Sequence, residues 1–382
     1  MRNKEEIRLQ RVVMAFCAIL FAVFSFLFVA RYQSTLLELL YEKVATGKLQ
    51  YNAYVVAAVI TTALTVFALW LNRYTGFKRE WTAFSFMPSA LLLAFVTDID
   101  RSLYTGEYDF LKWIIVFALA LFAYAAFSFV LRRVLFAKIK NIAMSANRII
   151  WRNLVLFVIL FSLVGFLSNG EENFKREVLI ASYYNKGDVE MALKVGVRSN
   201  VASHTLTAQR AYILAKEGLL GEKLFEYPQL YGAEGLIPDV VQTSPLVPDS
   251  VFTMLGVVPG DGEKARDLLK RALDADDVSN AVKDYYLSAL LLDRCIVEFV
   301  DAVECLYPDT EITDLPKHYQ EALMLYSNIE GAEQMVENNA MLEQFELFKA
   351  LECEHDDFFV RGNYLRRKFG HTYWWYCLYG NI

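Results

Sequence analysis

Five long stretches of this chain contain no charged side chain, and they constrain its fold more than any other feature. A helix rises ~1.5 Å per residue and the hydrocarbon layer of a bilayer is ~30 Å thick. Each stretch is therefore close to the length that crosses a membrane. We predict five transmembrane helices in a lipid bilayer, the third of them kinked by Pro88. The stretches are Val12–Ala30, Ala53–Leu71, Trp81–Thr97, Trp113–Leu131 and Asn153–Ser168, with 19, 19, 17, 19 and 16 residues.

The charge of the chain changes sign after the last of these stretches. Residues 1–168 carry 18 Lys and Arg against nine Asp and Glu, and residues 169–382 carry 20 against 35. The two parts have net charges of +9 and −15. We therefore divide the chain into a transmembrane domain, 1–168, and a soluble domain, 169–382. A strongly acidic domain repels phosphate backbones, so nucleic acid is a poor partner.

The basic residues of the short connecting loops predict the orientation. Thirteen of them lie before the first run, between the second and third, and between the fourth and fifth, against five in the other loops. Cytoplasmic loops retain Lys and Arg, so the N-terminus is expected in the cytoplasm. An odd number of crossings then places residues 169–382 outside it. In the first outer loop, 31–52, the spacing of leucines suggests an amphipathic helix on the membrane surface, with a simple linker as the alternative.

Residues 169–382 have the apolar spacing of helices, with intervals of three and four. Turn residues such as Gly187 and Asp188 mark helix ends. Successive helical pairs bury their apolar faces only by stacking, which predicts an α-solenoid or a compact helical array. Five of the eight prolines lie in residues 228–260, a loop that is either a binding loop or a linker, with a short helix at 250–255. The expected helices are 172–185, 188–199, 203–217, 262–274, 279–306 with a break near Asp293, 314–328, 331–350 and 356–369.

Leu179, Tyr183 and Ala192, with the turn at 185–188 between them, resemble one tetratricopeptide repeat. Gly196 and Ser199 depart from that pattern, and its 34-residue period is not sustained. More broadly, the layout, the segment Leu315–Ala322 and the aromatic run Tyr373–Tyr376 resemble an uncharacterised family of bacterial multi-pass envelope proteins. The resemblance implies a protein of the bacterial inner membrane with a periplasmic domain. Together with the apolar runs and the helical spacing, it leads us to expect an all-α protein with a five-helix transmembrane bundle followed by a tetratricopeptide-like α-solenoid.

Aromatic and basic side chains gather near the end of the sequence and form our candidate binding surface. Such a surface suits a peptide, a sugar or lipid head groups, whereas the alternative is a segment packed on the last helices. The candidate binding residues are Tyr364, Phe369, Tyr373, Trp374, Trp375, Tyr376, Arg366 and Arg367.

Two carboxylates, Asp98 and Asp100, follow the third apolar run, with Glu107 and Asp109 nearby. Paired outward carboxylates are able to hold a divalent cation or act as acid and base. We nevertheless favour acidic residues that only end a span, because Asp-x-Asp alone is a weak signal.

Four of the five cysteines, Cys295, Cys305, Cys353 and Cys377, lie in the part expected to face an oxidising compartment. Cys295 and Cys305 are ~15 Å apart if they share a helix, so a candidate disulfide joins that segment to Cys353 or Cys377. The alternative is that they are small core residues.

No metal or cofactor motif is apparent. Cys353, His355, Asp356 and Asp357 come from one turn, whereas closed zinc sites draw on separated pairs. The glycines at 256–262 lack the strand and the lysine of a phosphate loop. We therefore expect no metal and no cofactor.

No charged residue interrupts the five runs, which argues against a coupled transporter or channel. The sequence favours a non-catalytic membrane-anchored scaffold or adaptor whose periplasmic domain binds protein or peptide partners of the envelope. The alternative is a membrane-embedded enzyme that transfers glycosyl or lipid groups with Asp98 and Asp100.

Overall fold

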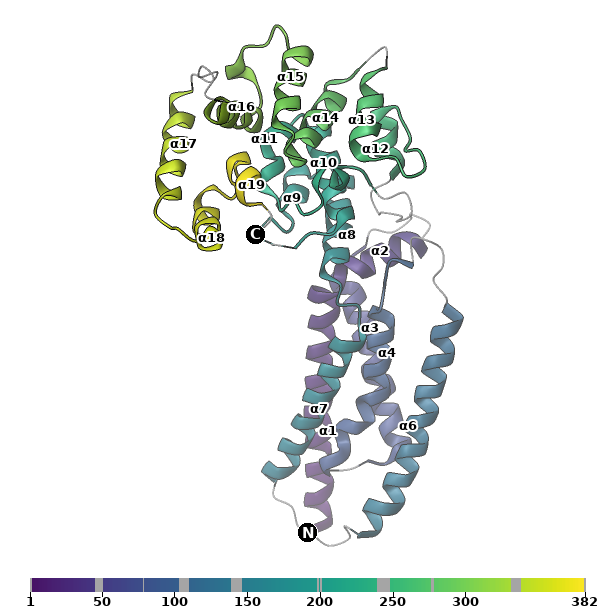
Figure 1. Ribbon diagram of the computed structural model, residues 1–382. Helices are drawn as coiled ribbons and strands as arrows, with labels where there is room; N and C mark the ends of the chain where they lie inside the picture. Colours follow the sequence, from purple (N-terminus) through teal and green to yellow (C-terminus); the bar gives the residue numbers. More distant parts are fainter. Residues whose placement is uncertain are drawn as a thin grey trace. The chain divides into compact units, whose positions relative to one another are not determined.

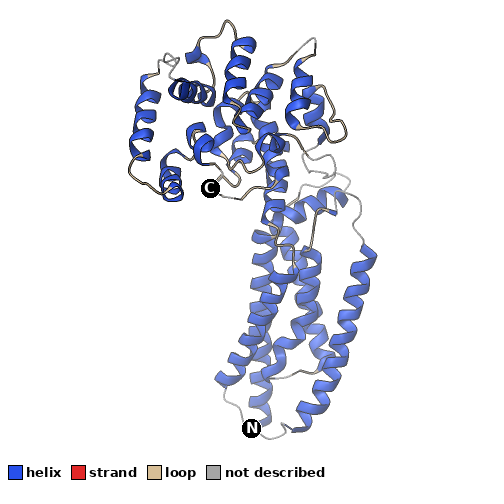
Figure 2. Ribbon diagram, viewed as in Figure 1, coloured by secondary structure: helices blue, strands red, loops and turns tan. Residues whose placement is uncertain are grey.

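The computed structural model describes ten ranges of the chain, and all of its regular structure there is helical, with no strand (Figures 1 and 2). The chain divides into two compact units, Met1–Lys175 and Arg176–Ile382, here called the N-terminal and C-terminal units. The boundary expected from the sequence, at Ser168, lies seven residues earlier than Lys175. The described ranges are 2–44, 51–77, 79–102, 110–138, 146–197, 199, 201–238, 248–275, 278–330 and 338–380.

Three stretches of the N-terminal unit are long and apolar enough to cross a membrane: Ile7–Tyr32, Ala53–Thr75 and Ala146–Leu167. The other two predicted spans appear as shorter apolar stretches, Trp81–Thr97 and Ile114–Val130, so five crossings are not confirmed. The elements are α1 (Arg2–Leu27), η1 (Phe28–Tyr32), α2 (Ser34–Val44), α3 (Ala53–Thr75), η2 (Arg79–Phe86), α4 (Met87–Thr97), α6 (Phe110–Lys138) and α7 (Ala146–Leu167).

The third predicted span is not one α-helix with a kink at Pro88. It begins as the 3₁₀-helix η2 and becomes the α-helix α4 at Met87, so Pro88 lies in the first turn of α4. A proline is tolerated there because the N–H that it lacks would have no partner within the helix. The expected kink is therefore wrong, and the proline instead marks where α4 begins.

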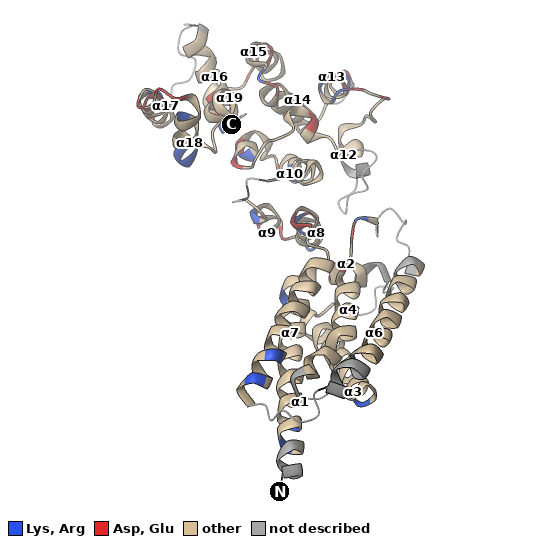
Figure 3. Ribbon diagram, turned by 60° about the horizontal axis from the view of Figure 1, so that its bottom comes forward, with Lys and Arg blue, Asp and Glu red and all other residues tan. Residues whose placement is uncertain are grey.

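Buried polar side chains fasten the helices of the N-terminal unit to one another. Asn153 of α7 accepts a hydrogen bond from the backbone N–H of Ala83 in η2 at 2.7 Å. Ser89 of α4 donates to the carbonyl oxygen of Leu64 in α3 at 2.9 Å. The outward faces of these helices are apolar, and Figure 3 shows few charged positions along them. The helix expected after the first run exists as α2, with Leu36, Leu37 and Leu39 buried.

The helices expected in the C-terminal unit are present among the described residues, although several are shorter. Residues 331–337, the start of the expected helix 331–350, lie outside the described ranges. At the first turn, Gly187 adopts a φ of +78° and Asp188 accepts a hydrogen bond from the N–H of Met191, as the sequence indicated. The break near Asp293 is confirmed, because α14 ends at Leu292 and α15 begins at Ile296. The elements are α8 (Glu172–Asn185), α9 (Val189–Lys194), α10 (His204–Lys216), α11 (Leu220–Lys223), η3 (Leu224–Glu226), η4 (Gly232–Leu236), α12 (Pro248–Leu255), α13 (Ala265–Leu273), α14 (Asn280–Leu292), α15 (Ile296–Leu306), η5 (Ile312–Asp314), α16 (Lys317–Glu330), α17 (Asn339–Glu352), α18 (Phe358–Phe369) and α19 (Tyr373–Tyr379).

The helices of this unit do not pack only on their neighbours in sequence. The central helix α14 contacts α10, α11, α12, α13, α15 and α19, and α16 contacts both α11 and α19. In a solenoid each repeat contacts only the adjacent repeats. The tetratricopeptide-like solenoid is therefore not confirmed, and the contacts describe a compact helical array.

The proline-rich segment 228–260 contributes to this core where it is described. Ala233 and Leu236 of η4 and Val251 and Leu255 of α12 are buried in it. The short helix expected at 250–255 is confirmed and begins two residues earlier. Residues 239–247 of the loop lie outside the described ranges.

Candidate functional site

The segment Leu315–Ala322, which the sequence analysis singled out, forms the start of α16. Pro316 precedes the helix. The backbone N–H of Lys317, in the first turn, has no acceptor within the helix and donates to the Glu222 carboxylate of α11 at 3.1 Å. The two helices approach closely at Gly221, where an added Cβ would lie 2.6 Å from the side chain of Pro316. A helix terminus with unsatisfied N–H groups is thus stabilised by a side chain that lies 95 residues away in sequence.

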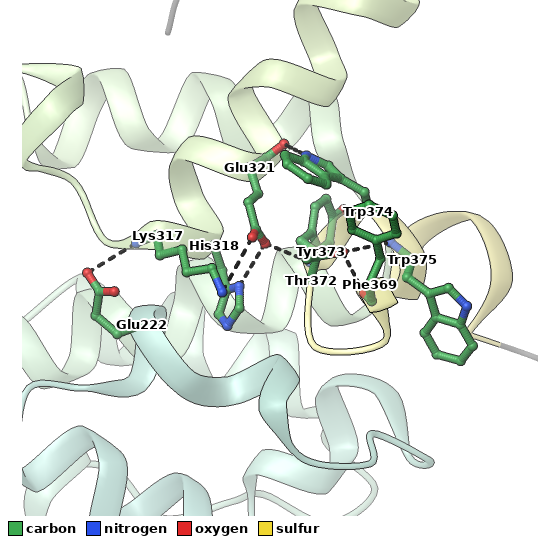
Figure 4. Close-up of polar contacts among 9 residues, drawn as sticks. All are labelled: Glu222, Lys317, His318, Glu321, Phe369, Thr372, Tyr373, Trp374 and Trp375. Atoms are coloured by element: carbon green, nitrogen blue, oxygen red, sulfur yellow. Dashed lines mark hydrogen bonds and ion pairs between the residues drawn. The ribbon is translucent and has the colours of Figure 1, made fainter. Parts of the chain in front are cut away.

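His318 and Glu321 form a fully buried pair on the next turn of α16, with 0% and 1% of their surface exposed. His318 Nδ1 lies 2.8 Å from Glu321 Oε2, and the same oxygen accepts the backbone N–H of Tyr373 at 2.7 Å. The indole N–H of Trp374 donates to the carbonyl oxygen of Glu321 at 2.8 Å (Figure 4). The structure thereby joins the two sequence motifs through one glutamate.

The helix α19 is held in place by its own cap as well. Thr372 accepts the N–H of Trp375 at 3.3 Å and donates to the carbonyl oxygen of Phe369 at 2.7 Å. The indole N–H of Trp375 reaches the carbonyl oxygen of Gly362, and the Tyr376 hydroxyl reaches that of Leu292, both at 2.8 Å. The polar groups of Trp375 and Tyr376 thus have partners, which favours the burial of these two rings.

These contacts agree with the alternative from the sequence, a terminal segment packed on the last helices, for most of the candidate binding residues. Phe369, Tyr373, Trp374, Trp375 and Tyr376 are all at most 8% exposed and belong to the core. Of the other candidate residues, Tyr364 is 41% exposed, Arg367 is exposed, and Arg366 is half-buried with its guanidinium over the Trp375 ring at 5.3 Å. The aromatic run is therefore mainly a packing element.

The His318–Glu321 pair does not have the exposure of a catalytic base. His318 Nε2 is buried with no hydrogen-bond partner among the described residues, and the Phe225 ring meets the imidazole edge-on at 5.0 Å. A substrate would need access to that nitrogen, since a general base acts within hydrogen-bond reach. The pair is placed to fix α19 on α16.

Residues around this pair line two cavities. The larger, of about 400 Å³, lies among α11, η5, α16 and α17 and is lined by Glu222, Thr313, Asp314, Leu315, Lys317, Gln320, Glu321, Asn338, Ala340, Met341 and Gln344. The smaller, of about 190 Å³, includes Phe225, Gln229, Arg366, Trp375 and Tyr376 in its lining. Three members of the candidate binding set thus reach a cavity, although they do not form an open surface.

The larger cavity contains a buried acceptor that the sequence analysis missed. Gln320 is 6% exposed, and its amide nitrogen donates to the carbonyl oxygens of Thr313 and Leu315 at 3.0 and 2.7 Å. These two acceptors fix the orientation of the amide, because only its NH₂ group donates. Its Oε1 is buried and has no hydrogen-bond partner in the described part of the chain. The only sequence signal was its place inside the segment Leu315–Ala322.

The Asp98 and Asp100 pair follows the end of α4, as expected from the sequence. Partial burial, together with the Asp100 charge, raises the pKa of Asp98 above its ordinary value. Asp100 accepts hydrogen bonds from the N–H and the hydroxyl of Ser102. Asp100 thus orders its own turn, and Glu107 and Asp109 lie outside the described residues.

The cysteines of the C-terminal unit lie in different surroundings. Cys305 and Cys353 are exposed, and Cys295 and Cys377 are half-buried, all as free thiols. Cys295 and Cys305 lie at opposite ends of α15, so the helix separates them as the sequence indicated. Pairing with Cys353 or Cys377 stays a prediction. Among the described residues, no three His, Cys, Asp or Glu side chains are grouped as metal ligands would be.

Comparison with known proteins gives one match. Residues 260–380 match the model of a family of unknown function, DUF6057. The matched range contains both Leu315–Ala322 and Tyr373–Tyr376, and therefore most of the cluster in Figure 4. No curated protein and no solved structure matched the chain. This C-terminal third of the chain is thus similar to a family whose function is unassigned.

Proposed function

We propose that the protein is a non-catalytic membrane-anchored scaffold whose C-terminal unit binds a peptide or protein segment in the larger cavity. The observation that carries the proposal is that Gln320, which lines a polar cavity of about 400 Å³, has a buried Oε1 without a hydrogen-bond partner among the described residues. A buried acceptor without a partner is costly, at about 1–3 kcal/mol, and a backbone N–H of a bound segment would satisfy it.

The lining of the cavity supports a neutral or basic partner segment. Glu222, Asp314 and Glu321 contribute carboxylates and only Lys317 contributes an ammonium group among the residues that line it. The amides of Asn338 and Gln344 add donors and acceptors, which suit a peptide backbone. An acidic segment would meet an excess of like charge.

The membrane topology belongs to the same proposal. Three helices are long and apolar enough to cross a bilayer. The five charge-free runs favour five crossings, and the basic residues of the loops favour a cytoplasmic N-terminus. The C-terminal unit then lies in the periplasm of a bacterial cell and meets partners of the envelope. A compartment reporter fused after Ser168, and a second at Ile382, are both expected to report the periplasm, and a cytoplasmic signal from either contradicts this topology.

Site-directed photocrosslinking in cells tests the partner. A photoreactive residue in place of Gln344, which is exposed at the cavity, is expected to give an adduct of defined mass. The same residue in place of Glu304, exposed on α15 and outside the cavity, serves as the matched control. The variant Asp314→Lys is expected to reduce the Gln344 adduct, because it reverses a charge in the lining. Equal adducts from both positions, or none from Gln344, would contradict the proposal.

The second candidate function is the transfer of glycosyl or lipid groups by Asp98 and Asp100. Its support is the raised pKa of Asp98, because a carboxyl group with a raised pKa is suited to act as a general acid. The double variant Asp98→Asn with Asp100→Asn separates the candidates. If the protein is such an enzyme, the double variant is expected to lose the cellular function at an unchanged protein level. If the protein is a scaffold, the double variant is expected to keep that function.

A further inference from the structure

A third cavity, in the N-terminal unit, has the composition of a lipid site. It measures about 490 Å³ and is lined by Trp81, Arg148, Trp151, Arg152, Val155 and Leu156. Small-molecule sites commonly enclose about 300–1,000 Å³. Two guanidinium groups at one end and aliphatic side chains at the other match the two ends of an anionic phospholipid. None of the described lining residues is acidic.

The wall of this cavity is held by buried hydrogen bonds. The carboxamide oxygen of Asn153 accepts the N–H of Ala83, and its nitrogen donates to the carbonyl oxygen of Ile149 at 2.9 Å. These bonds fix η2, which carries Trp81, against α7, which carries the other lining residues. The cavity is thus formed by two elements, η2 and α7, that hydrogen bonds hold together.

The basic end of the cavity lies at the start of α7. This helix begins at Ala146, so Arg148 is in its first turn and Arg152 is one turn further along the same face. Positive side chains are disfavoured near a helix N-terminus, where the helix dipole is itself positive. An anion bound there would interact favourably with this end of the helix.

The third observation is an indole donor without an acceptor. Trp81 Nε1 is buried and has no hydrogen-bond partner within the described ranges. Because indole N–H groups usually find a partner when buried, this donor is available to an acceptor of a bound ligand. The ester carbonyl and phosphate oxygens of a phospholipid are such acceptors.

We propose that this cavity binds one anionic phospholipid. Its phosphate lies against Arg148 and Arg152, an oxygen of its polar region accepts from Trp81, and its acyl chains run along Val155 and Leu156. Basic pockets at the cytoplasmic side of transmembrane helices recognise anionic head groups in this way. The inference rests on the proposed membrane location of the N-terminal unit, with this end of α7 on the cytoplasmic side.

Lipid binding by the full chain in neutral detergent tests the inference. Phosphatidylglycerol is titrated and the bound lipid is counted by native mass spectrometry, with phosphatidylcholine and inorganic phosphate as the comparison ligands. Replacing both arginines, Arg148→Gln with Arg152→Gln, is expected to weaken phosphatidylglycerol binding about 30-fold, at about 1 kcal/mol for each basic residue. Trp81→Phe keeps the ring, removes only the donor and is expected to weaken binding less.

The matched control is Arg8→Gln with Arg11→Gln, which removes the same charge from exposed positions outside the cavity. An equal loss of phosphatidylglycerol binding in both double variants would mean that the lipid is attracted by the overall positive charge, and it would overturn the site. Equal binding of phosphatidylcholine, or full competition by inorganic phosphate, would overturn a phospholipid as the ligand. Membrane fractionation of the same variants distinguishes the lipid site from the proposed membrane location. If the protein stays in the membrane fraction but shows no lipid selectivity, the site is refuted and the membrane anchor still holds.

Discussion

The two units of this chain distribute the same residue types in opposite ways. In the N-terminal unit, Phe122 and Phe166 are 74% and 85% exposed, while Asn153 and Ser89 are fully buried. In the C-terminal unit, Phe299 and Phe348 are at most 1% exposed, and Figure 3 shows charged positions on most of its helices. Apolar surface is stable only away from water, so the two units are built for different surroundings. The contrast supports the proposed bilayer.

The largest expected effect comes from removing the aromatic core of the C-terminal unit. Trp374→Ala deletes a fully buried ring beside Phe345, with centroids 4.9 Å apart, and also the hydrogen bond to Glu321. We expect a loss of about 3–5 kcal/mol in the free energy of unfolding of this unit. Chemical denaturation followed by tryptophan fluorescence and circular dichroism measures it.

The control for this variant is Leu378→Ala, whose side chain is 37% exposed on the same helix. It is expected to cost far less. Similar losses in the two variants would contradict the importance of the buried indole.

A matched pair of substitutions sharpens the comparison between the outer faces. Val66 of α3 is 59% exposed and Val297 of α15 is 53% exposed. Val66→Lys is expected to cost about 3 kcal/mol in membrane insertion, because it places a charge near the centre of an apolar helix. Val297→Lys is expected to stay within about 0.5 kcal/mol, as surface changes in water usually do.

Glycosylation-based insertion assays for α3, and thermal unfolding for the C-terminal unit, measure the two effects. If Val66→Lys inserts as well as the unmodified helix, the exposed face of α3 does not contact lipid.

A smaller effect is expected from the polar interior of the N-terminal unit. Asn153→Leu leaves the N–H of Ala83 without its acceptor and is expected to cost about 1–2 kcal/mol. Unfolding in increasing SDS, followed by circular dichroism, measures this change. Asn147→Leu, exposed on the same helix, is the control. Equal stability of the two variants would show that the buried amide does not fasten η2 to α7.

The smallest effect is a pH dependence of the C-terminal unit. Partial burial and the charge of Lys317 lower the pKa of His371 below its ordinary value of 6.5, although Glu321 and Glu226 oppose the shift. The unfolded chain then binds this proton more tightly than the folded unit. Stability should therefore fall as the pH drops below 6.5 towards the lowered value, and recover at higher pH.

Denaturation midpoints between about pH 5 and about pH 8 reveal this dependence, since histidine titrates in that range. His371→Gln is expected to flatten the curve, and His355→Gln controls for the loss of an imidazole elsewhere. An unchanged slope in His371→Gln would assign the dependence to another group.

The helices could be predicted largely from the sequence because local signals determine them. The limits of α8 follow from its apolar spacing, and its end from Gly187 and Asp188. The burial of the aromatic run could not be predicted in this way. It depends on acceptors far away in sequence: the carbonyl oxygens of Glu321, Gly362 and Leu292 lie 53, 13 and 84 residues from their donors. Composition alone does not reveal such partners.

The candidate cavity of the C-terminal unit was missed for a related reason. Gln320 is an ordinary polar residue in the sequence, and only the fold brings it beside Asn338 and Gln344 of another segment. Asp98 and Asp100 were easier to place, because they follow an apolar run whose end is visible in the sequence.

The hydrogen bond from Tyr373 to Glu321 joins residues 52 positions apart, and it has a consequence for biosynthesis. While the ribosome is still translating the intervening codons, α16 has emerged with a carboxylate whose donor does not yet exist. A nascent polypeptide that stalls in this interval lacks the helix that seals Phe225 and His318. Such a fragment would expose apolar surface to chaperones and proteases, which gives the cell a means to recognise incomplete copies.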